Sequence, residues 1–291
     1  MILVISSAEA DDETEKVIGE ASTDDVSHDL SRLFLRDSEV LLNPSEIQIS
    51  IGFNYTTNET QRSFRKNRSR SISIPLNVSY GLTRRLEINA SVPFIYNENE
   101  VLSDANVSDD SKSGIGDLSL GLSYRLKSES VSSPSITASL NIITPTGETT
   151  DPKDFNGLST GAGFWGVSTS LSFSKAIDPA VVFFNIGYQH TFEEEQFDSD
   201  IQPGDAYNYG FGAGLSVNSL VAFSGRILGS YQKETKLNQK IVHGTIYEPI
   251  SLIWSMSYRL NDKIRIETTL SQGVSEDADN VEIGFAYIWN L

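Results

Sequence analysis

The sequence predicts an all-β protein, a transmembrane antiparallel up-and-down β-barrel of twelve strands with a short N-terminal helical segment. Three observations lead to this prediction. Apolar residues alternate with small polar ones in twelve segments, the connections between segments are alternately short and long, and aromatic residues gather at both ends of the apolar phase. An alternation of period two is typical of a β-strand with one apolar and one polar face.

The stretch IGDLSLGLSYRLKS, residues 115–128, shows the alternation clearly. Its leucines and Tyr124 fall on every second position, with Asp117, Arg125, serines and a glycine between them. Comparable stretches recur from Glu46 to the end of the sequence. The expected strands cover residues 46–57, 69–80, 85–96, 115–127, 134–145, 163–174, 180–192, 207–217, 220–232, 249–260, 263–272 and 280–291.

The connections between the expected strands favour a membrane barrel over a soluble sandwich, which would also alternate with its polar residues outward. Links after the even strands are short, as in residues 81–84. Most links after the odd strands are long and polar, and they cover residues 97–114, 146–162, 193–206 and 233–248. Short turns at one end and long loops at the other are typical of outer-membrane barrels.

The aromatic residues of the apolar phase form two belts when both chain termini are placed in the periplasm. The belt at the long-loop end contains Tyr55, Tyr96, Trp165, Tyr188, Tyr209 and Tyr231. The belt at the short-turn end contains Tyr80, Tyr124, Phe173, Tyr258 and Trp289. Aromatic rings favour the two interfaces of a membrane. We therefore expect the apolar face to meet lipid in the bacterial outer membrane and the polar face to enclose water.

Composition excludes several other classes of protein. The 291 residues carry a net charge of −17, which argues against binding to nucleic acid because phosphates would be repelled. No cysteine is present, so no disulfide framework and no thiolate metal site are expected. The sequence contains no apolar run long enough for a transmembrane helix.

The N-terminal region is expected to contain two parts that precede the barrel of residues 46–291. Residues 1–10 resemble the tail of a secretory signal peptide, with Ala8-Glu9-Ala10 as a cleavage pattern. Residues 11–45 form an acidic periplasmic leader, in which residues 25–36 predict a short helix. The apolar face of that helix contains Val26, Leu30, Leu33 and Phe34. The helix either plugs the lumen or packs on the rim of the barrel.

The polar phase of the strands carries charges of both signs. The expected lumen-lining residues are Glu87, Asp117, Arg125, Arg226, Arg259, Arg265, Glu267 and Glu282. Four basic and four acidic residues give no large field of one sign, and they either pair with one another or set ion selectivity. The acidic long loops are expected to attract cations to the outer vestibule.

The last strand, EIGFAYIWNL, contains a pattern of Gly284, Tyr287 and Trp289 before the terminal Leu291. This pattern resembles the C-terminal signature by which the barrel-assembly machinery recognises outer-membrane barrels. The chain departs from that signature because it ends in Asn-Leu rather than in an aromatic residue.

Several segments together resemble one family of barrels. They include YGLTRRLEINASVPFIY (80–96), GIGDLSLGLSYRL (114–126), GAGFWGVSTSLSF (161–173), DPAVVFFNIGY (178–188), IQPGDAYNYGFGAGLSVN (201–218) and SYRLNDKIRIETTLSQGVSEDADNVEIGF (257–285). They are similar to the meta-pathway phenol-degradation-type outer-membrane family, and most similar to the secretion channel of bacterial functional-amyloid export systems. The lead-in LFLRDSEVLLNPSEIQISIGFNY (33–55) matches the plug segment of those channels.

This resemblance implies a twelve-stranded barrel, a homotrimer, an N-terminal helical plug and passage of an unfolded polypeptide. The longer coiled-coil region that precedes the plug in the amyloid exporters is absent from the sequence. The resemblance therefore supports the barrel and the channel more strongly than an amyloid cargo.

Residues suited to catalysis or metal binding show no recognisable motif. His28, His190 and His243 do not fall at a spacing typical of a serine hydrolase. The run GFGAG at 210–214 repeats its glycines with period two, which indicates a strand rather than a dinucleotide loop. The acidic loops lack the fixed spacing of a calcium site. No catalytic residue, metal or cofactor is expected.

The sequence thus predicts an outer-membrane channel that is not an enzyme. The leading hypothesis is export of an unfolded amyloid-forming polypeptide through a plug-gated barrel. The first alternative is passive uptake of small hydrophobic or aromatic compounds, and the second is a surface enzyme or adhesin on a closed barrel. The expected partners are outer-membrane lipid, the assembly machinery, and a polypeptide or small-molecule cargo whose identity stays open.

Overall fold

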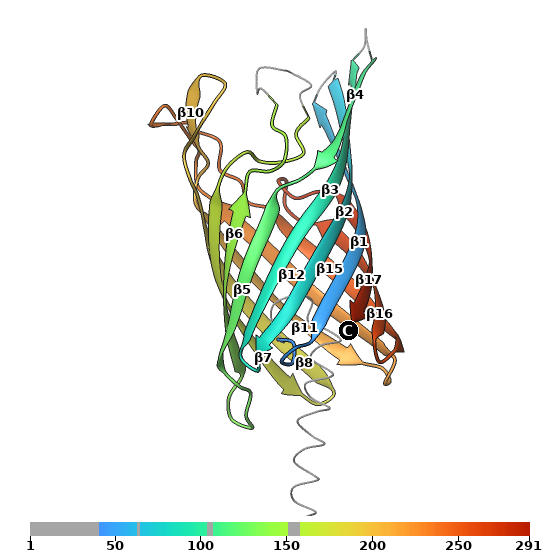
Figure 1. Cartoon of the computed structure of the whole chain (residues 1–291). Helices are drawn as coiled ribbons and strands as arrows, with labels where there is room; N and C mark the ends of the chain where they lie inside the picture. Colours follow the sequence, from blue (N-terminus) through green and yellow to red (C-terminus); the bar gives the residue numbers. More distant parts are fainter. Residues whose placement is uncertain (1–40, 63–64, 104–106, 151–157) are drawn as a thin grey trace, which may run out of the picture.

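A computed structural model describes residues 41–62, 65–103, 107–150 and 158–291, in which all regular structure is β (Figure 1). Twelve strands form the barrel. They are β1 (Ile47–Arg62), β2 (Arg65–Thr83), β3 (Leu86–Ser103), β5 (Leu118–Lys127), β6 (Ser135–Thr144), β7 (Gly166–Ile177), β8 (Ala180–Thr191), β11 (Ala206–Ser216), β12 (Val221–Gln232), β15 (Ile250–Asn261), β16 (Ile264–Gly273) and β17 (Val281–Asn290).

The barrel is closed because every one of these strands has a hydrogen-bonded neighbour on both sides. Antiparallel pairing runs from β2 through β1 and β17 around to β5 and β3, and β3 pairs with β2 again. The first and last strands are therefore neighbours, with Tyr55 opposite Ile283 and Ile49 opposite Trp289. Closure leaves no open strand edge within the barrel wall. The predicted twelve-stranded antiparallel barrel is confirmed.

The long connections contain more β-structure than the sequence indicated. Segment 97–114 was expected to be a loop, but it extends β3 and includes β4 (Val107–Ile115), which pairs with the upper part of β3. Four short strands, β9 (Glu194–Gln196), β10 (Ser199–Gln202), β13 (Lys236–Leu237) and β14 (Lys240–Ile241), form a separate small sheet. These strands are only two to four residues long, which is too short for an alternation of period two to be recognised.

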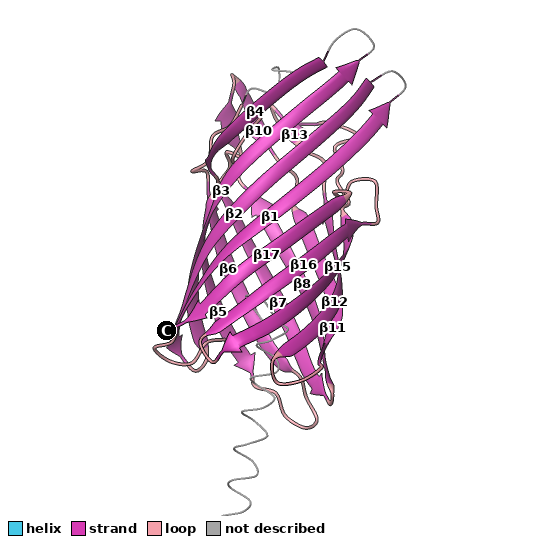
Figure 2. Ribbon diagram, turned by 90° about the vertical axis from the view of Figure 1, so that its right-hand side faces the viewer, coloured by secondary structure: helices cyan, strands magenta, loops and turns pink. Residues whose placement is uncertain are grey.

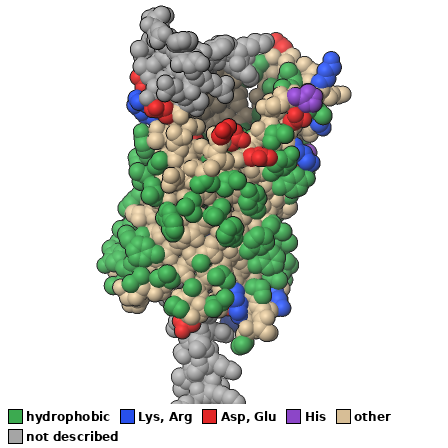
Figure 3. Space-filling model, turned by 180° about the vertical axis from the view of Figure 1, so that it is seen from behind, with side chains coloured by type: hydrophobic (Ala, Val, Ile, Leu, Met, Phe, Trp, Pro, Cys, Tyr) green, Lys and Arg blue, Asp and Glu red, His purple; other side chains and the backbone are tan. Residues whose placement is uncertain are grey.

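The barrel has its apolar side chains outside and its polar side chains inside. On β5, Leu122 is 40% exposed whereas the next residue, Ser123, is 2% exposed. On β1, Ile51 is 50% exposed and Ser50 is 6% exposed. Figure 3 shows apolar side chains around the middle of the outer surface. An apolar surface of this extent is stable only in an apolar surrounding, which for a closed barrel is a lipid bilayer.

The two ends of the barrel differ as expected. The hairpin turns β2–β3, β7–β8, β11–β12 and β15–β16 are short and lie at one end, called here the short-turn end. The connections β3–β5, β6–β7, β8–β11 and β12–β15 lie at the other, long-loop end. Figure 2 shows that β1, β2, β3 and β4 extend well beyond the other strands at the long-loop end.

The expected signal remnant (1–10) and the plug helix (25–36), with Val26, Leu30, Leu33 and Phe34, lie outside the described residues. Of the predicted leader of residues 11–45, only residues 41–45 are described. No helix among the described residues is long and apolar enough to cross a membrane.

Because apolar side chains face lipid and polar side chains face the bore, an arginine should destabilise the barrel more at an outward position than at an inward one. Replacing the outward-facing Ile186, in the middle of β8, by arginine places a charge against lipid hydrocarbon and should cost about 2–4 kcal/mol of unfolding free energy. The matched control is Ser170→Arg on β7, whose side chain faces inward and should cost less than about 1 kcal/mol. Denaturant unfolding in lipid vesicles measures both. Equal losses would contradict the assignment of the two faces.

Candidate transport path through the barrel

The inner face of the barrel is lined mainly by small polar side chains, because serine, threonine, asparagine and glycine occupy the inward phase. A glycine is required where the side chains of both neighbouring strands occupy the space that its own side chain would fill. A Cβ at Gly121, for example, would overlap the side chains of Asn89 and Asn141 on the strands at either side. Small inward residues leave more space inside the wall than large ones would.

Seven of the eight predicted lumen charges lie at inward positions of the strands. Four are basic (Arg125, Arg226, Arg259 and Arg265) and three are acidic (Glu87, Glu267 and Glu282). The eighth, Asp117, lies between β4 and β5 rather than in a strand as the sequence suggested. Among these seven residues the basic ones therefore outnumber the acidic ones by one, because Asp117 is not part of a strand.

These seven charges are unevenly distributed along the barrel. Glu87, Arg125, Arg259, Arg265 and Glu267 lie near the short-turn end, where Arg259 is directly opposite Arg265 in the antiparallel register. Arg226 lies near the middle of β12, and Glu282 is the second residue of β17, at the long-loop end. Of these seven charged residues, only Arg226 therefore lies near the middle of the bore.

The chain segment before β1 enters the bore at the short-turn end. Leu41 and Leu42 are almost completely buried, and the backbone N–H of Leu42 donates a hydrogen bond to Oε2 of Glu87 at 2.7 Å. The carbonyl of Asn43 lies against Gly81 on the inner face of β2, so that a Cβ at Gly81 would overlap it. Residues 41–43 thus narrow this end of the bore. Sequence reasoning missed this contact because nothing in the sequence relates Leu42 to Glu87.

The described residues of the β6–β7 connection, 145–150 and 158–165, fold inward at the long-loop end. Asp117 holds both of its arms, since Oδ1 accepts a hydrogen bond from the N–H of Gly147 at 3.0 Å and Oδ2 accepts one from the N–H of Ala162 at 2.7 Å. Thr160 is 3% exposed, and its Oγ1 accepts from the N–H of Glu148 and donates to the carbonyl of Ile115. Asp117 is therefore an anchor for this connection.

Two further contacts place this connection on the inner side of the wall. Asn97 and Lys112 are opposite each other on the inward phase of β3 and β4. Asn97 Nδ2 donates to the carbonyl of Ser159 at 2.7 Å, and Lys112 Nζ donates to Oγ1 of Thr150 at 3.2 Å. The mouth of the bore is therefore narrowed by this connection.

Between the two narrowed ends lies an inner cavity of about 450 Å³. Ser168, Ser170, Asn185 and Asn208 are among its polar lining residues on β7, β8 and β11. Leu228 and Ile253, on β12 and β15, are apolar members of the lining, and Glu282 lies at its rim. The cavity therefore belongs to the inner face of the wall, which carries residues 41–43 at the short-turn end and the anchored β6–β7 connection at the long-loop end.

The predicted aromatic belts lie on the outward phase of the strands. Trp165, Tyr188, Tyr209 and Tyr231 are outward near the long-loop end, and Tyr124, Tyr258 and Trp289 are outward near the short-turn end, each between 38% and 45% exposed. Tyr55, Tyr96, Tyr80 and Phe173 are half-buried at corresponding outward positions. Tyr207, which the sequence analysis left out, stacks against Tyr188 with ring centroids 5.4 Å apart. In the expected assembly signal, Tyr287 and Trp289 face outward and Gly284 faces inward.

Outside the apolar band, charged residues of β1–β3 pair on the outward face. Arg70 lies 2.8 Å from Glu98, and Arg68 lies 3.3 Å from both Glu59 and Glu100. These pairs stand above Tyr55 and Tyr96, so polar side chains replace apolar ones at that level of the wall.

The histidines do not form a catalytic site among the described residues. His190 Nδ1 lies 2.7 Å from Oδ1 of Asp205, and Lys233 Nζ lies 3.6 Å from its Oδ2. The hydrogen bond with His190 is the main reason that the pKa of Asp205 is below its usual range. His243 is exposed beside Glu234, and His28 is outside the described residues. No group of three His, Cys, Asp or Glu side chains in the described ranges is placed to hold a metal ion.

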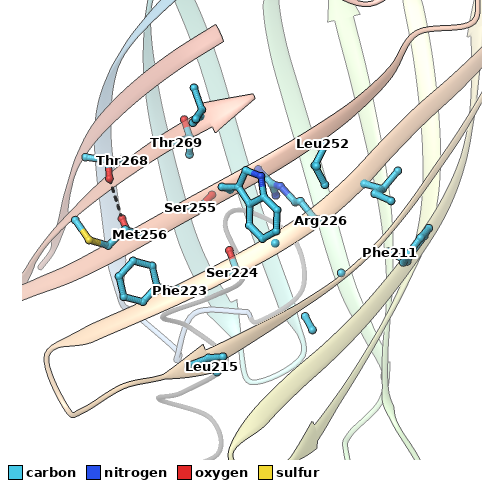
Figure 4. A pocket seen from close by; sticks show the side chains of 16 residues that line it. Phe211, Leu215, Phe223, Ser224, Arg226, Leu252, Ser255, Met256, Thr268 and Thr269 are labelled. Carbon is cyan, nitrogen blue, oxygen red and sulfur yellow. Dashed lines mark hydrogen bonds between the residues drawn. The ribbon is translucent and has the colours of Figure 1, made fainter. Parts of the chain in front are cut away.

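Two outer hollows of about 750 and 800 Å³ interrupt the apolar band. Figure 4 shows side chains that line the first, among them Phe211, Phe223 and Leu252. A Cβ at Gly225 would overlap the ring of Trp254, which also lines this hollow. Gly225 is opposite Trp254, whereas the next residue, Arg226, is opposite Ile253 on the other face. The outer hollow and the inner path are therefore separated by the thickness of one strand.

Comparisons with known proteins agree with this architecture. Residues 41–291 match the family described as "Putative MetA-pathway of phenol degradation". The crystal structure of an outer membrane channel from Pseudomonas putida F1 is similar with a TM-score of 0.70 and 16% identity, covering 88% of this chain and 99% of that one. The transport unit of the autotransporter AIDA-I from Escherichia coli has a TM-score of 0.50 and 8% identity, covering 93% and 96%. The two structural likenesses show the same closed β-barrel fold.

Loss of the Asp117 anchor should widen the mouth. In Asp117→Ala the N–H groups of Gly147 and Ala162 lose their acceptors, so the β6–β7 connection should leave the inner wall. Single-channel recording in planar bilayers should show a higher conductance with more current noise. Asp110→Asn, at an exposed position of β4, removes one negative charge at the same end and should leave both unchanged. Equal effects of the two variants would contradict the anchoring role.

Loss of the Glu87 acceptor should loosen the short-turn end. Glu87→Ala leaves the buried N–H of Leu42 without its acceptor, which should lower the unfolding free energy by about 1–3 kcal/mol and raise conductance. Glu87→Gln keeps an acceptor oxygen and should lose less. Denaturant unfolding and conductance measured on both variants provide the check. A Glu87→Ala protein with unchanged conductance would show that residues 41–43 do not limit the current.

Proposed function

Because the chain belongs to this phenol-degradation family, we propose that it is an outer-membrane channel through which small aromatic compounds enter the cell. Phenol degradation requires an aromatic substrate to cross the outer membrane, and the family description concerns that chemistry. The single observation that supports passage is the closed barrel with a polar inner face and an inner cavity of about 450 Å³. A cavity of this size suits a small organic molecule.

Uptake has more support than export of an unfolded amyloid-forming polypeptide, which was the leading hypothesis from the sequence. The family match concerns phenol degradation, and no comparison above describes amyloid export. The bore is also narrowed by residues 41–43 at one end and by the β6–β7 connection at the other. A single-ring compound is small enough to need less rearrangement of these segments than a polypeptide chain.

The orientation proposed for the channel places the short-turn end and both termini in the periplasm. Short turns on the periplasmic side and long loops outside are the usual arrangement of outer-membrane barrels. The aromatic belts would then lie at the two membrane interfaces, and residues 41–43 would act on the periplasmic side. A plug in the preceding leader and a homotrimer remain predictions from the resemblance.

A current-block experiment tests the proposed function. Phenol added to one chamber of a planar bilayer that holds the full chain should interrupt the ion current, with a frequency that rises with its concentration. An unfolded polypeptide of low complexity is the comparison. Interruptions by the polypeptide without any by phenol would favour export, and the absence of any conducting path would favour an adhesin or enzyme on a closed barrel.

A further inference from the structure

We propose that the bore prefers small organic anions that carry an apolar ring, such as aromatic carboxylates, and that Arg226 binds their anionic group. This inference rests on the proposed function and names the substrate class of the same path. It follows from the surroundings of Arg226, the composition of the neighbouring cavity and the charges along the wall.

Arg226 is an inward-facing cation whose cross-strand partners are uncharged. It is directly opposite Gly212 on β11 and Ile253 on β15, and Ser224 and Leu228 flank it on β12. Its Nε is buried and has no hydrogen-bond partner, and none of the ion pairs between described residues includes it. A guanidinium in this state presents donors in a planar fork that matches a carboxylate.

Two apolar neighbours of Arg226 line the inner cavity. Leu228 is the next inward residue of β12 after Arg226, and Ile253 is its cross-strand partner on β15. Both line the cavity of about 450 Å³, together with Ser170, Asn185 and Asn208 on β7, β8 and β11. An aromatic ring that rests on Leu228 and Ile253 would bring a carboxylate within reach of Arg226.

The remaining charges of the path are consistent with an anionic solute. Arg259 and Arg265 lie nearer the short-turn end, so a solute that leaves Arg226 in that direction meets further cations, together with Glu267 on β16. Glu282 lies at the long-loop rim of the cavity and opposes entry of an anion. The acidic loops are farther away and are screened over about 8 Å at physiological ionic strength. Selection is therefore expected at the cavity and not at the mouth.

Benzoate and benzyl alcohol test the proposal because they share a ring and differ in charge. In the full-length channel in planar bilayers, benzoate should block the current about tenfold longer per event than benzyl alcohol, as a charge-assisted bond adds to ring contact. Arg226→Gln should remove this difference while benzyl alcohol events stay unchanged. Arg226→Lys keeps the charge and should keep most of the difference. Glu282→Gln should increase the frequency of benzoate events.

The outcomes separate this inference from the proposed function. Lys263→Gln removes one positive charge from an exposed turn at the short-turn end and should leave the benzoate preference unchanged. Equal block times for both compounds in the unmodified channel, or an unchanged preference in Arg226→Gln, would overturn the inference alone. No interruption by either compound would overturn the proposed uptake of aromatic compounds as well. Should Arg226→Gln fail to fold, Arg226→Lys and Glu282→Gln still decide the matter.

Discussion

The structure depends on closure of the hydrogen-bonded sheet. A strand in hydrocarbon has no water to satisfy its backbone N–H and C=O groups, so each must pair with a neighbouring strand. Pairing of β3 with β2, and of β1 with β17, completes that ring. Once the ring is closed, the alternation of side chains assigns every second residue to lipid and every other one to the bore. The apolar exterior and polar interior follow from this one constraint.

The same constraint explains why the bore is narrowed by segments outside the strands. Strand residues can only point inward from a wall of fixed radius, and the small side chains at these positions leave space. The bore is narrowed instead by backbone brought in from both ends, namely residues 41–43 and the β6–β7 connection. Each is held by a carboxylate, Glu87 or Asp117, which accepts hydrogen bonds from backbone N–H groups. Charge in this bore therefore serves position as well as selectivity.

Much of the barrel was predictable from the sequence because its side chains obey a two-residue period. The strand around Leu122 and Ser123 is an example, since its two phases differ in both polarity and exposure. The short strands β9, β10, β13 and β14 escaped prediction because two to four residues cannot show a period of two. Strand β4 escaped because its residues 108–113 are all polar. Their pairing depends on contacts between loops that are distant in sequence.

The candidate path was predictable only in part, for a related reason. Alternation placed Arg226 and Glu267 at inward positions, but it does not show which charges lie beside which neighbours. Asp117 follows the period of β5 and yet lies outside that strand, held by the N–H groups of Gly147 and Ala162. The contact between Leu42 and Glu87 joins residues 45 positions apart. Contacts of this kind join residues that are distant in sequence, and the local periodicity of a sequence does not predict them.

The pairing of the first strand, β1, with the last strand, β17, affects how the barrel folds. Gln48 and Asn290 are partners although 242 positions separate them, so the final seam joins the most distant parts of the barrel. The entropy of joining such distant segments must be overcome before the seam yields any stabilisation, which slows folding. Until then β1 and β17 each expose an unpaired edge that invites association with other chains. Completion of the ring is thus the step at which catalysed assembly has most to gain over spontaneous folding.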